Sequence, residues 1–229
     1  MHNFNIWMIV YVKNEKRMNN FLELSTRLNC RLFEAIDTIN EHEKYAKFAL
    51  ENVYTDKVFI DKYKIDIGKL GCNLSHQLLL QKINSESQNS DSSDWNLILE
   101  DDVSIDTNDF YLKMSNIIEQ ANQNNSDYIH LITHNKFMVD QLKQKKVNDL
   151  YEMIPQYYCT AFLVNQKGIQ TMLNCFPICR EIDIEFSRQI KNMNSLCWIN
   201  NTFKNEGSID RNNTNNTKYG SLLWKGHNN

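Results

Sequence analysis

The sequence predicts an α/β domain, a sheet with parallel strands covered by helices, and three observations at the start of the chain lead to this fold class. Residues 5–12, NIWMIVYV, form a continuous run of apolar, β-branched and aromatic side chains, which is typical of a strand buried on both faces. Residues 14–29 place apolar side chains at helical spacing. Residues 31–37, RLFEAID, predict a second strand. Because a helix connects the two strands, we expect them to pair in parallel.

The middle of the chain continues this alternation. A helix near 41–52 is expected inside a charged and aromatic segment with weak periodicity. Residues 68–83, GKLGCNLSHQLLLQKI, place two glycines before a helix with an apolar stripe, and the polar segment 84–94 predicts a loop. Residues 95–100, WNLILE, predict a buried strand.

The last part of the chain predicts further helices and strands. Helices are expected over 107–122, with Asn108 as its cap, over 165–176 and over 183–193, and strands over 127–133, 157–164 and 195–200. Residues 134–156 are irregular and are expected to form a flap. No domain boundary stands out, so we expect one domain over 1–204 and a polar, flexible tail over 205–229.

Composition restricts the class of partner. The net charge is −3 and the pI about 6.1, which excludes the basic footprint of a duplex-DNA-binding protein, and the basic run 143–146, KQKK, is interpreted as a solvated loop. The six cysteines contain no CxxC pair, so no zinc site is expected and the thiols are taken as free, as in a cytoplasmic protein. The apolar run at the N-terminus is far shorter than the roughly 18 residues of a transmembrane helix, so no membrane span is expected.

Three consecutive carboxylates, Glu100, Asp101 and Asp102, follow the strand 95–100. Side chains alternate along a strand, so Glu100 and Asp102 are expected on one side and Asp101 on the other. Converging carboxylates need a cation or a donor-rich ligand, although a simple acidic turn is the plainer interpretation. An EF-hand loop would need glycine at 107 and glutamate at 113, where this chain has Thr107 and Lys113. The pattern instead suits Mn²⁺ or Mg²⁺ shared with the phosphate oxygens of a ligand.

The segment GKLGCNLSHQ is the second stretch that suggests a binding site. Gly68 and Gly71 allow tight backbone conformations where the helix is expected to start, and free amides there favour an anionic group. His76 follows a short apolar step and could face either the core or a cleft. A lone histidine is more often structural than functional.

Together these two stretches resemble the central block of glycosyltransferase family 25, which includes bacterial lipooligosaccharide galactosyltransferases and collagen-modifying galactosyltransferase domains. The family pattern is Gly-Glu-(Ile/Leu)-Gly-Cys-x-x-Ser-His, then a helix, then a strand that ends in Leu-Glu-Asp-Asp. Weaker resemblances follow in the family's order: the first strand with the Glu-Lys-Arg that follows it, and the segments 34–37, 160–173, 181–186 and 207–210.

The chain departs from the family pattern at several positions. Lys69 replaces the usual glutamate, Thr38 replaces a glycine and Glu181 replaces a proline. After the first strand, Lys13 and Asn14 stand where the family has Asn-Leu. The change after the first strand affects the region expected to recognise the base and ribose of a nucleotide.

The resemblance implies a GT-A-like glycosyltransferase fold, with a Rossmann-like central mixed sheet flanked by helices and nucleotide binding at the carboxyl ends of the strands. It implies a metal-dependent, inverting transfer of a hexose, most often galactose, from a UDP-sugar to a hydroxyl of a glycan or collagen-like protein. The residues expected to contact the donor are Val12, Arg17, Asp37, Gly71, Ser75, His76, Glu100 and Asp101.

The resemblance also suggests roles at the reacting centre. Asp102 is expected to bind the metal directly, and Glu100 through water or, alternatively, to contact the ribose. Asp101 would orient the sugar or accept amides within the fold. Asp183 is the candidate base, with a helix cap as its alternative role. His227, near Lys225, is a candidate late metal ligand, and a disordered end is the alternative there.

Two other functions are weighed against this one. A catalytically degenerate GT-A fold could bind a nucleotide sugar or a partner without turnover, and the altered segment after the first strand motivates this alternative. A nucleic-acid module has only dispersed lysines and aromatic residues in its favour.

Overall fold

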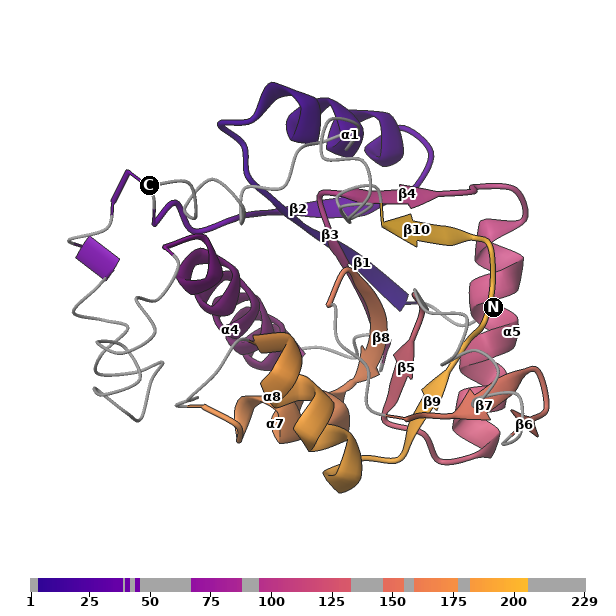
Figure 1. The fold of residues 1–229 in the computed structure, drawn as a ribbon. Coiled ribbons are helices and arrows are strands. Elements are labelled where there is room, and N and C mark those ends of the chain that lie inside the picture. Colours follow the sequence, from indigo (N-terminus) through magenta and orange to yellow (C-terminus); the bar gives the residue numbers. More distant parts are fainter. Residues whose placement is uncertain are drawn as a thin grey trace, which may run out of the picture.

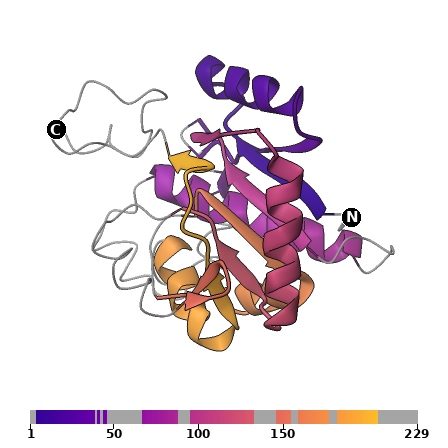
Figure 2. The same cartoon turned by 90° about the vertical axis from the view of Figure 1, so that its right-hand side faces the viewer.

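A central sheet lies between two layers of helices in the computed structural model, which describes residues 4–38, 40–41, 44–45, 67–87, 95–132, 146–154, 159–176 and 182–205 (Figure 1). Helices α1 (Glu15–Ser25) and α5 (Phe110–Gln123) cover one face of the sheet. Helices α4 (Ile67–Ser87), α7 (Gln166–Leu173) and α8 (Ile182–Gln189) cover the other (Figure 2). A short 3₁₀-helix, Ile190–Asn192, follows α8.

The sheet has eight strands and is mixed, as expected. In spatial order they are β2 (Cys30–Glu34), β1 (Phe4–Val10), β3 (Trp95–Glu100), β8 (Ala161–Asn165), β5 (Tyr128–His130), β9 (Ser195–Cys197), β7 (Leu150–Glu152) and β6 (Lys146–Val147). Strand β1 is parallel to both β2 and β3, as the first two strands of the sequence predict. Strand β8 runs antiparallel to both β3 and β5, which the sequence does not reveal.

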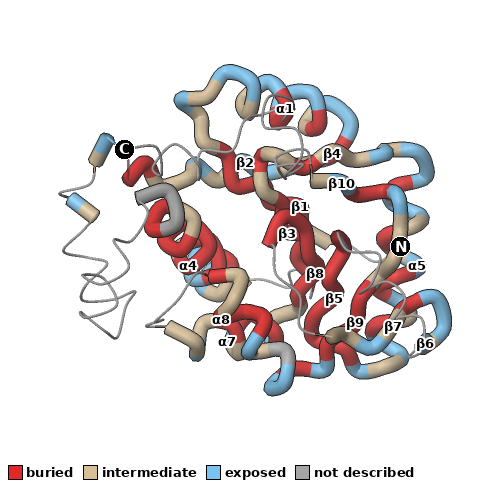
Figure 3. Tube along the Cα trace, in the orientation of Figure 1, coloured by how far each residue is buried: buried red, intermediate tan, exposed pale blue. Residues whose placement is uncertain are grey.

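Both faces of the central strands are buried, which explains their continuous apolar runs (Figure 3). In β3, Leu97 and Leu99 pack toward α1 and α5, whereas Ile98 packs toward α4 and α8. In β8, Phe162 belongs to the α4 side and Leu163 to the opposite side. This alternation along each strand divides the core into two hydrophobic clusters, one on each face of the sheet.

Asparagine side chains cap the starts of α1 and α7, whereas the start of α5 differs from the expected one. Asn14 caps α1, because its side chain accepts a hydrogen bond from the amide of Arg17, and Asn165 caps α7 in the same way. Asn108 does not cap α5, as the sequence had suggested. The cap position is Asp109, which adopts a positive φ of 52° and makes no side-chain cap bond, while the amide of Asn108 donates to Asp106.

Four short strands were not predicted. Residues 146–152, expected to be irregular, form the β6–β7 hairpin with Asn148 at positive φ in its turn. Strands β4 (Val103–Ile105) and β10 (Phe203–Asn205) form a separate antiparallel pair, so regular structure extends one residue past the expected boundary at 204. The expected helix near 41–52 lies almost entirely outside the described residues, and most of the expected flap and tail do too.

The register of β1 and β3 places the candidate site. Ile9 pairs with Glu100, so the segments that follow these parallel strands leave the sheet at the same edge. Open α/β sheets bind their ligands at this carboxyl edge. Within the described ranges, no helix has the length and apolar character needed to span a bilayer.

Candidate active site

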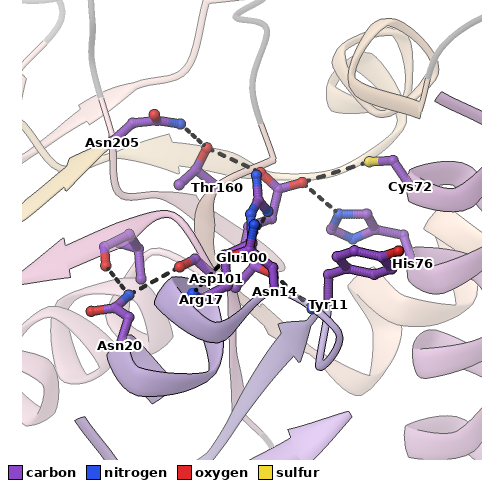
Figure 4. Close-up of polar contacts among 11 residues, drawn as sticks. Tyr11, Asn14, Arg17, Asn20, Cys72, His76, Glu100, Asp101, Thr160 and Asn205 are labelled. Atoms are coloured by element: carbon purple, nitrogen blue, oxygen red, sulfur yellow. Dashed lines mark hydrogen bonds and ion pairs between the residues drawn. The ribbon is translucent and has the colours of Figure 1, made fainter. Parts of the chain in front are cut away.

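The three carboxylates occupy the point where β3 ends and the chain turns into β4, and Figure 4 shows two of them, Glu100 and Asp101, with their partners. Glu100 is the last residue of β3, and Asp101 and Asp102 form the turn. Although adjacent in sequence, the three side chains have different partners. Their surroundings decide which of them is already neutralised by the protein.

Glu100 is surrounded by polar groups from α4 and from the segment before β8. Its Oε2 accepts a hydrogen bond of 3.2 Å from the Thr160 hydroxyl, just before β8. Its Oε1 lies 3.2 Å from His76 Nε2 and 3.6 Å from Cys72 Sγ, both on α4. Burial acts to raise the pKa of Glu100, but the hydrogen bond and charge of His76 outweigh it and lower the pKa. Glu100 is therefore held as a carboxylate.

Asp101 is used to join two segments of the fold. Its Oδ2 accepts the backbone amide of Tyr11 at 2.7 Å, and its Oδ1 pairs with the guanidinium of Arg17. The Asn20 side chain donates to the carbonyls of Asp101 and Val103, at 3.0 and 2.8 Å. This geometry matches the expected alternative in which Asp101 accepts amides within the fold. The Arg17 guanidinium, which was expected to contact the donor, therefore forms an ion pair with a carboxylate of the protein itself.

Asp102 is in the opposite situation. Its Oδ1 is buried and has no hydrogen-bond partner among the described residues. Burial, together with the carboxylates of Glu100 and Asp101, raises the pKa of Asp102 to about 8. A buried acid oxygen without a donor, next to two further carboxylates, is what a divalent cation would neutralise. The residues present therefore fit a divalent ion.

Helix α4 brings Cys72 and His76 to Glu100 from the neighbouring layer. The two residues are one turn apart, and the cysteine sulfur, a histidine nitrogen and a Glu100 oxygen all lie within 4.8 Å of one another. The His76 ring stacks on Phe162 and meets Phe186 edge-on, with centroids 6.1 and 6.0 Å apart. Burial, and next the Glu100 carboxylate, raise the pKa of the Cys72 thiol well above its usual range.

Gly71 and Ser75 hold α4 against the segment that follows β2. Because the helix begins at Ile67, Gly71 lies in its second turn, and the free amide expected there is absent. A Cβ at Gly71 would lie 2.8 Å from the Ile36 carbonyl oxygen, so glycine permits this close approach. The Ser75 hydroxyl accepts the Ile36 amide at 2.9 Å and donates to the Gly71 carbonyl at 2.6 Å.

Asp37 and Val12 lie at the same edge of the sheet. Asp37 is buried and forms an ion pair of 2.5 Å with Lys13, whose side chain is half exposed. Burial acts to raise the pKa of Asp37, but hydrogen bonds from Lys13 and Asn40 prevail and lower it to about 2. Val12 is partly buried against the core. Asp37 is therefore ionised and already paired with a cation of the protein.

Asp183 lies in the first turn of α8, beside the α4 residues. The amide of Ile182 donates to the Asn73 side chain at 2.9 Å, which ties the start of α8 to α4. After burial and Glu100, the Asp183 charge is the next cause that raises the pKa of Cys72, so Asp183 lies within electrostatic range of the site. The helix begins at Ile182, so Asp183 does not occupy the cap position of its alternative role. His227 lies outside the described residues.

Sequence reasoning identified His76 but missed three polar residues around Glu100, namely Cys72, Thr160 and Asn205. Cys72 carries a readable signal, because it lies four residues before His76, a spacing that places both on one face of a helix. Thr160 and Asn205 carry none. Asn205, from β10, donates to the Thr160 hydroxyl at 2.6 Å, and only tertiary pairing brings it there.

Comparisons with known proteins give one family and several distant structures, among them the two that follow. The family model described as glycosyltransferase family 25 (LPS biosynthesis protein) matches residues 5–185. The crystal structure of A197 from STIV is similar with a TM-score of 0.41 and 8% identity, covering 89% of this chain and 84% of that one. The apo structure of mouse xyloside xylosyltransferase 1 has a TM-score of 0.36 and 9% identity, covering 82% and 81%. No curated protein matches the chain, so the family match carries the assignment.

Proposed function

The chain belongs to glycosyltransferase family 25, and we propose that it is a metal-dependent, inverting enzyme that transfers galactose from a UDP-sugar to a hydroxyl of a glycan. Membership of the family supports a glycosyltransferase that uses a nucleotide-sugar donor. The metal, the galactose and the acceptor are the finer parts of the proposal. A collagen-like protein is the second acceptor class to be tested.

The observation that carries the proposal is the buried Oδ1 of Asp102, which has no partner among the residues that the structure describes and lies beside Glu100 at the carboxyl edge of the sheet. Asp102 would hold Mn²⁺ or Mg²⁺ directly, with Glu100 as a water-mediated ligand. The ion, when bound, supplies positive charge to the departing diphosphate. Asp101 is not needed as a ligand, because Arg17 and the Tyr11 amide already satisfy it.

The proposed donor site lies between the segment after β1, the segment after β2 and α4. Arg17 and Asp101 fix the first segment, and Gly71 and Ser75 fix α4 against the second. Four of the eight residues expected to contact the donor therefore position the edge of the site. This leaves Asp37 as the proposed contact to the ribose, with Lys13 already neutralising it.

Inversion needs a base that takes the proton of the acceptor hydroxyl as this hydroxyl attacks the sugar. Asp183 is the proposed base, because α8, which is tied to α4 by the Ile182–Asn73 hydrogen bond, brings its carboxylate within electrostatic range of Cys72. Its carboxylate accepts the amide of Ile184 at 2.8 Å, which orients the side chain at the helix start.

The test is UDP release from a panel of UDP-hexoses, with Mn²⁺ and with a chelator. Asp102→Ala should reduce the metal-dependent rate at least about 100-fold, since a metal ion contributes several kcal/mol to such transition states. Asp106→Ala is the matched control, because Asp106 is an exposed acid just after β4, and its side chain forms a surface ion pair with Lys113 and accepts the Asn108 amide. Release that is unaffected by chelation would refute the metal requirement.

The ion pair between Lys13 and Asp37 favours a second candidate, a degenerate fold that binds nucleotide sugar without turnover. Lys13 stands in the altered segment after β1 and covers the residue proposed to contact the ribose. In that case no donor would be turned over, and UDP binding measured by calorimetry would survive Asp102→Ala.

A further inference from the structure

We infer that Cys72, His76 and Glu100 form a binding site for a thiophilic divalent cation such as Zn²⁺. The site differs in its donor atoms from the carboxylate site proposed for Mn²⁺, yet the two share Glu100. Zn²⁺ is therefore inferred to compete with the catalytic ion and to inhibit transfer. The inference that Zn²⁺ binds depends only on the geometry of the three side chains. The inference that Zn²⁺ inhibits transfer also depends on the proposed function.

Two of the three distances between the donor atoms suit a tetrahedral ion. With bonds of about 2.3 Å to sulfur and 2.0–2.1 Å to nitrogen and oxygen, a tetrahedral zinc separates sulfur from oxygen by about 3.5 Å, and nitrogen from oxygen by about 3.3 Å. Here Cys72 Sγ is 3.6 Å and His76 Nε2 is 3.2 Å from Glu100 Oε1. The Cys72 sulfur and a His76 nitrogen lie within 4.8 Å of each other, and binding would bring them to about 3.5 Å.

The donor set selects the kind of ion. Sulfur and imidazole nitrogen favour Zn²⁺, whereas Mg²⁺ and Mn²⁺ prefer oxygen ligands. Three protein ligands leave the fourth position of a tetrahedral ion open. Asp102 is not part of this group, which in the part of the chain that is described consists of Cys72, His76 and Glu100.

The surrounding residues hold these ligands in place, but they do not make a bound ion resistant to exchange. Phe162 and Phe186 confine the His76 ring, and Thr160 holds the second oxygen of Glu100. His76 Nδ1 is buried and has no hydrogen-bond partner within the described part of the chain. Metal-bound histidines usually donate this second nitrogen, and loss of such a partner weakens binding about 10- to 100-fold. We therefore expect an exchangeable ion that a chelator removes without unfolding the protein.

Cobalt is the probe for binding, because a Co²⁺–thiolate bond gives a charge-transfer absorption that oxygen ligands do not give. The wild-type protein titrated with Co²⁺ should show this band, and Zn²⁺ should displace it. Cys72→Ala should abolish the band and weaken Zn²⁺ binding, measured against a chromophoric chelator, at least about 100-fold. Cys30→Ala is the matched control, since Cys30 lies at the start of the edge strand β2, outside the group.

The outcomes separate the site from the proposed function. A wild-type protein without the thiolate band, or a Cys72→Ala protein that keeps it, overturns the site. Should Cys72→Ala fail to fold, Cys72→Ser replaces it, with a folded state confirmed by circular dichroism. Zn²⁺ should inhibit Mn²⁺-dependent UDP release in the wild type and in Cys30→Ala, and inhibit Cys72→Ala far less relative to its own rate. Equal inhibition of all three overturns the competition, whereas no UDP release with any donor refutes only the proposed function.

Discussion

Asp101 and Asp102 are neighbours in the chain, but the folded protein provides partners for the side chain of Asp101 and not for Oδ1 of Asp102 among the described residues. Asp101 receives a backbone amide and a guanidinium, so its charge is balanced within the fold. Asp102 is partly buried beside two carboxylates, and its buried Oδ1 receives no hydrogen bond from the described residues. A buried acid oxygen without a donor destabilises the folded protein, and such a cost is typical of residues kept for a ligand.

The pKa of Asp102 predicts how metal-free stability depends on pH. Its pKa is raised from 3.8 to about 8, so between these values the folded protein binds a proton that the unfolded chain does not. Stability therefore falls as pH rises through this range. Asp102→Asn removes the ionisable group, so the variant should be more stable than the wild type by about 1–3 kcal/mol near pH 8.5, and by much less near pH 5.

Urea unfolding of both proteins in the presence of a chelator measures this difference at the two pH values. Asp106→Asn, at an exposed acid, should show no such pH-dependent gain. A wild type that is as stable as Asp102→Asn at the higher pH would mean that Asp102 has a donor in solution.

Asp102→Asn is expected to stabilise the protein, whereas a substitution that breaks the ion pair between Arg17 and Asp101 is expected to destabilise it. The two side chains are only 12% and 4% exposed, so removing the guanidinium leaves a buried charge without compensation. Arg17→Met should cost about 3–5 kcal/mol of unfolding free energy in urea titrations. Arg27→Met, which breaks an exposed pair with Glu23, should cost less than about 1 kcal/mol. The loss should be smaller when Asp101→Asn is also present, and additive losses would rule out a direct interaction.

At the scale of the elements, α4 determines the site by its position against the segment that follows β2. Gly71 lets the helix approach closely, and the same helix carries Cys72, Ser75 and His76. A small shift of α4 would therefore move several site residues at once.

Gly71→Ala tests this dependence. The added Cβ would meet the Ile36 carbonyl oxygen at 2.8 Å and the Thr38 hydroxyl at 2.9 Å, and such overpacking typically costs about 1–3 kcal/mol. Gln81→Ala, at an exposed position on the same helix, should be nearly neutral. Thermal unfolding gives the comparison, and a Gly71→Ala protein as stable as the control would show that the segment after β2 moves aside.

The elements also show which parts of the fold were readable. Strands β1 and β3 were predicted because both of their faces are buried, which leaves continuous apolar runs in the sequence. Strands β4, β6, β7 and β10 were missed, because two or three residues are too few to show a period. The predicted cap of α5 was wrong by one residue. Asp109 occupies the cap position with a positive φ, which no local sequence pattern predicts.

At the scale of the whole molecule, the site joins elements from both faces of the sheet. Helix α1 supplies Arg17 from one face, and α4 supplies Cys72 and His76 from the other, with β3 between them. An ion bound at this junction connects the layers. It should therefore stabilise the protein as a whole.

Metal binding should consequently raise the unfolding temperature. At about 100 times its dissociation constant, Mn²⁺ should add about 2.7 kcal/mol to the free energy of unfolding. Asp102→Ala should lose this gain, whereas Asp106→Ala should keep it, as measured by calorimetry with and without Mn²⁺. Equal stabilisation of both variants would place the ion elsewhere.

The sequence by itself determined the alternation of strands and helices, the position of three carboxylates at the end of a buried strand, and the resemblance to glycosyltransferase family 25, which the family model confirms. These properties are local, because hydrophobic periodicity and short motifs are written in neighbouring residues. The tertiary structure alone decided the strand order, the partner of each carboxylate and the meeting of Cys72 and His76 with Glu100. The charge state and ligand preference of a side chain depend on burial and on groups distant in sequence, which only folding brings together.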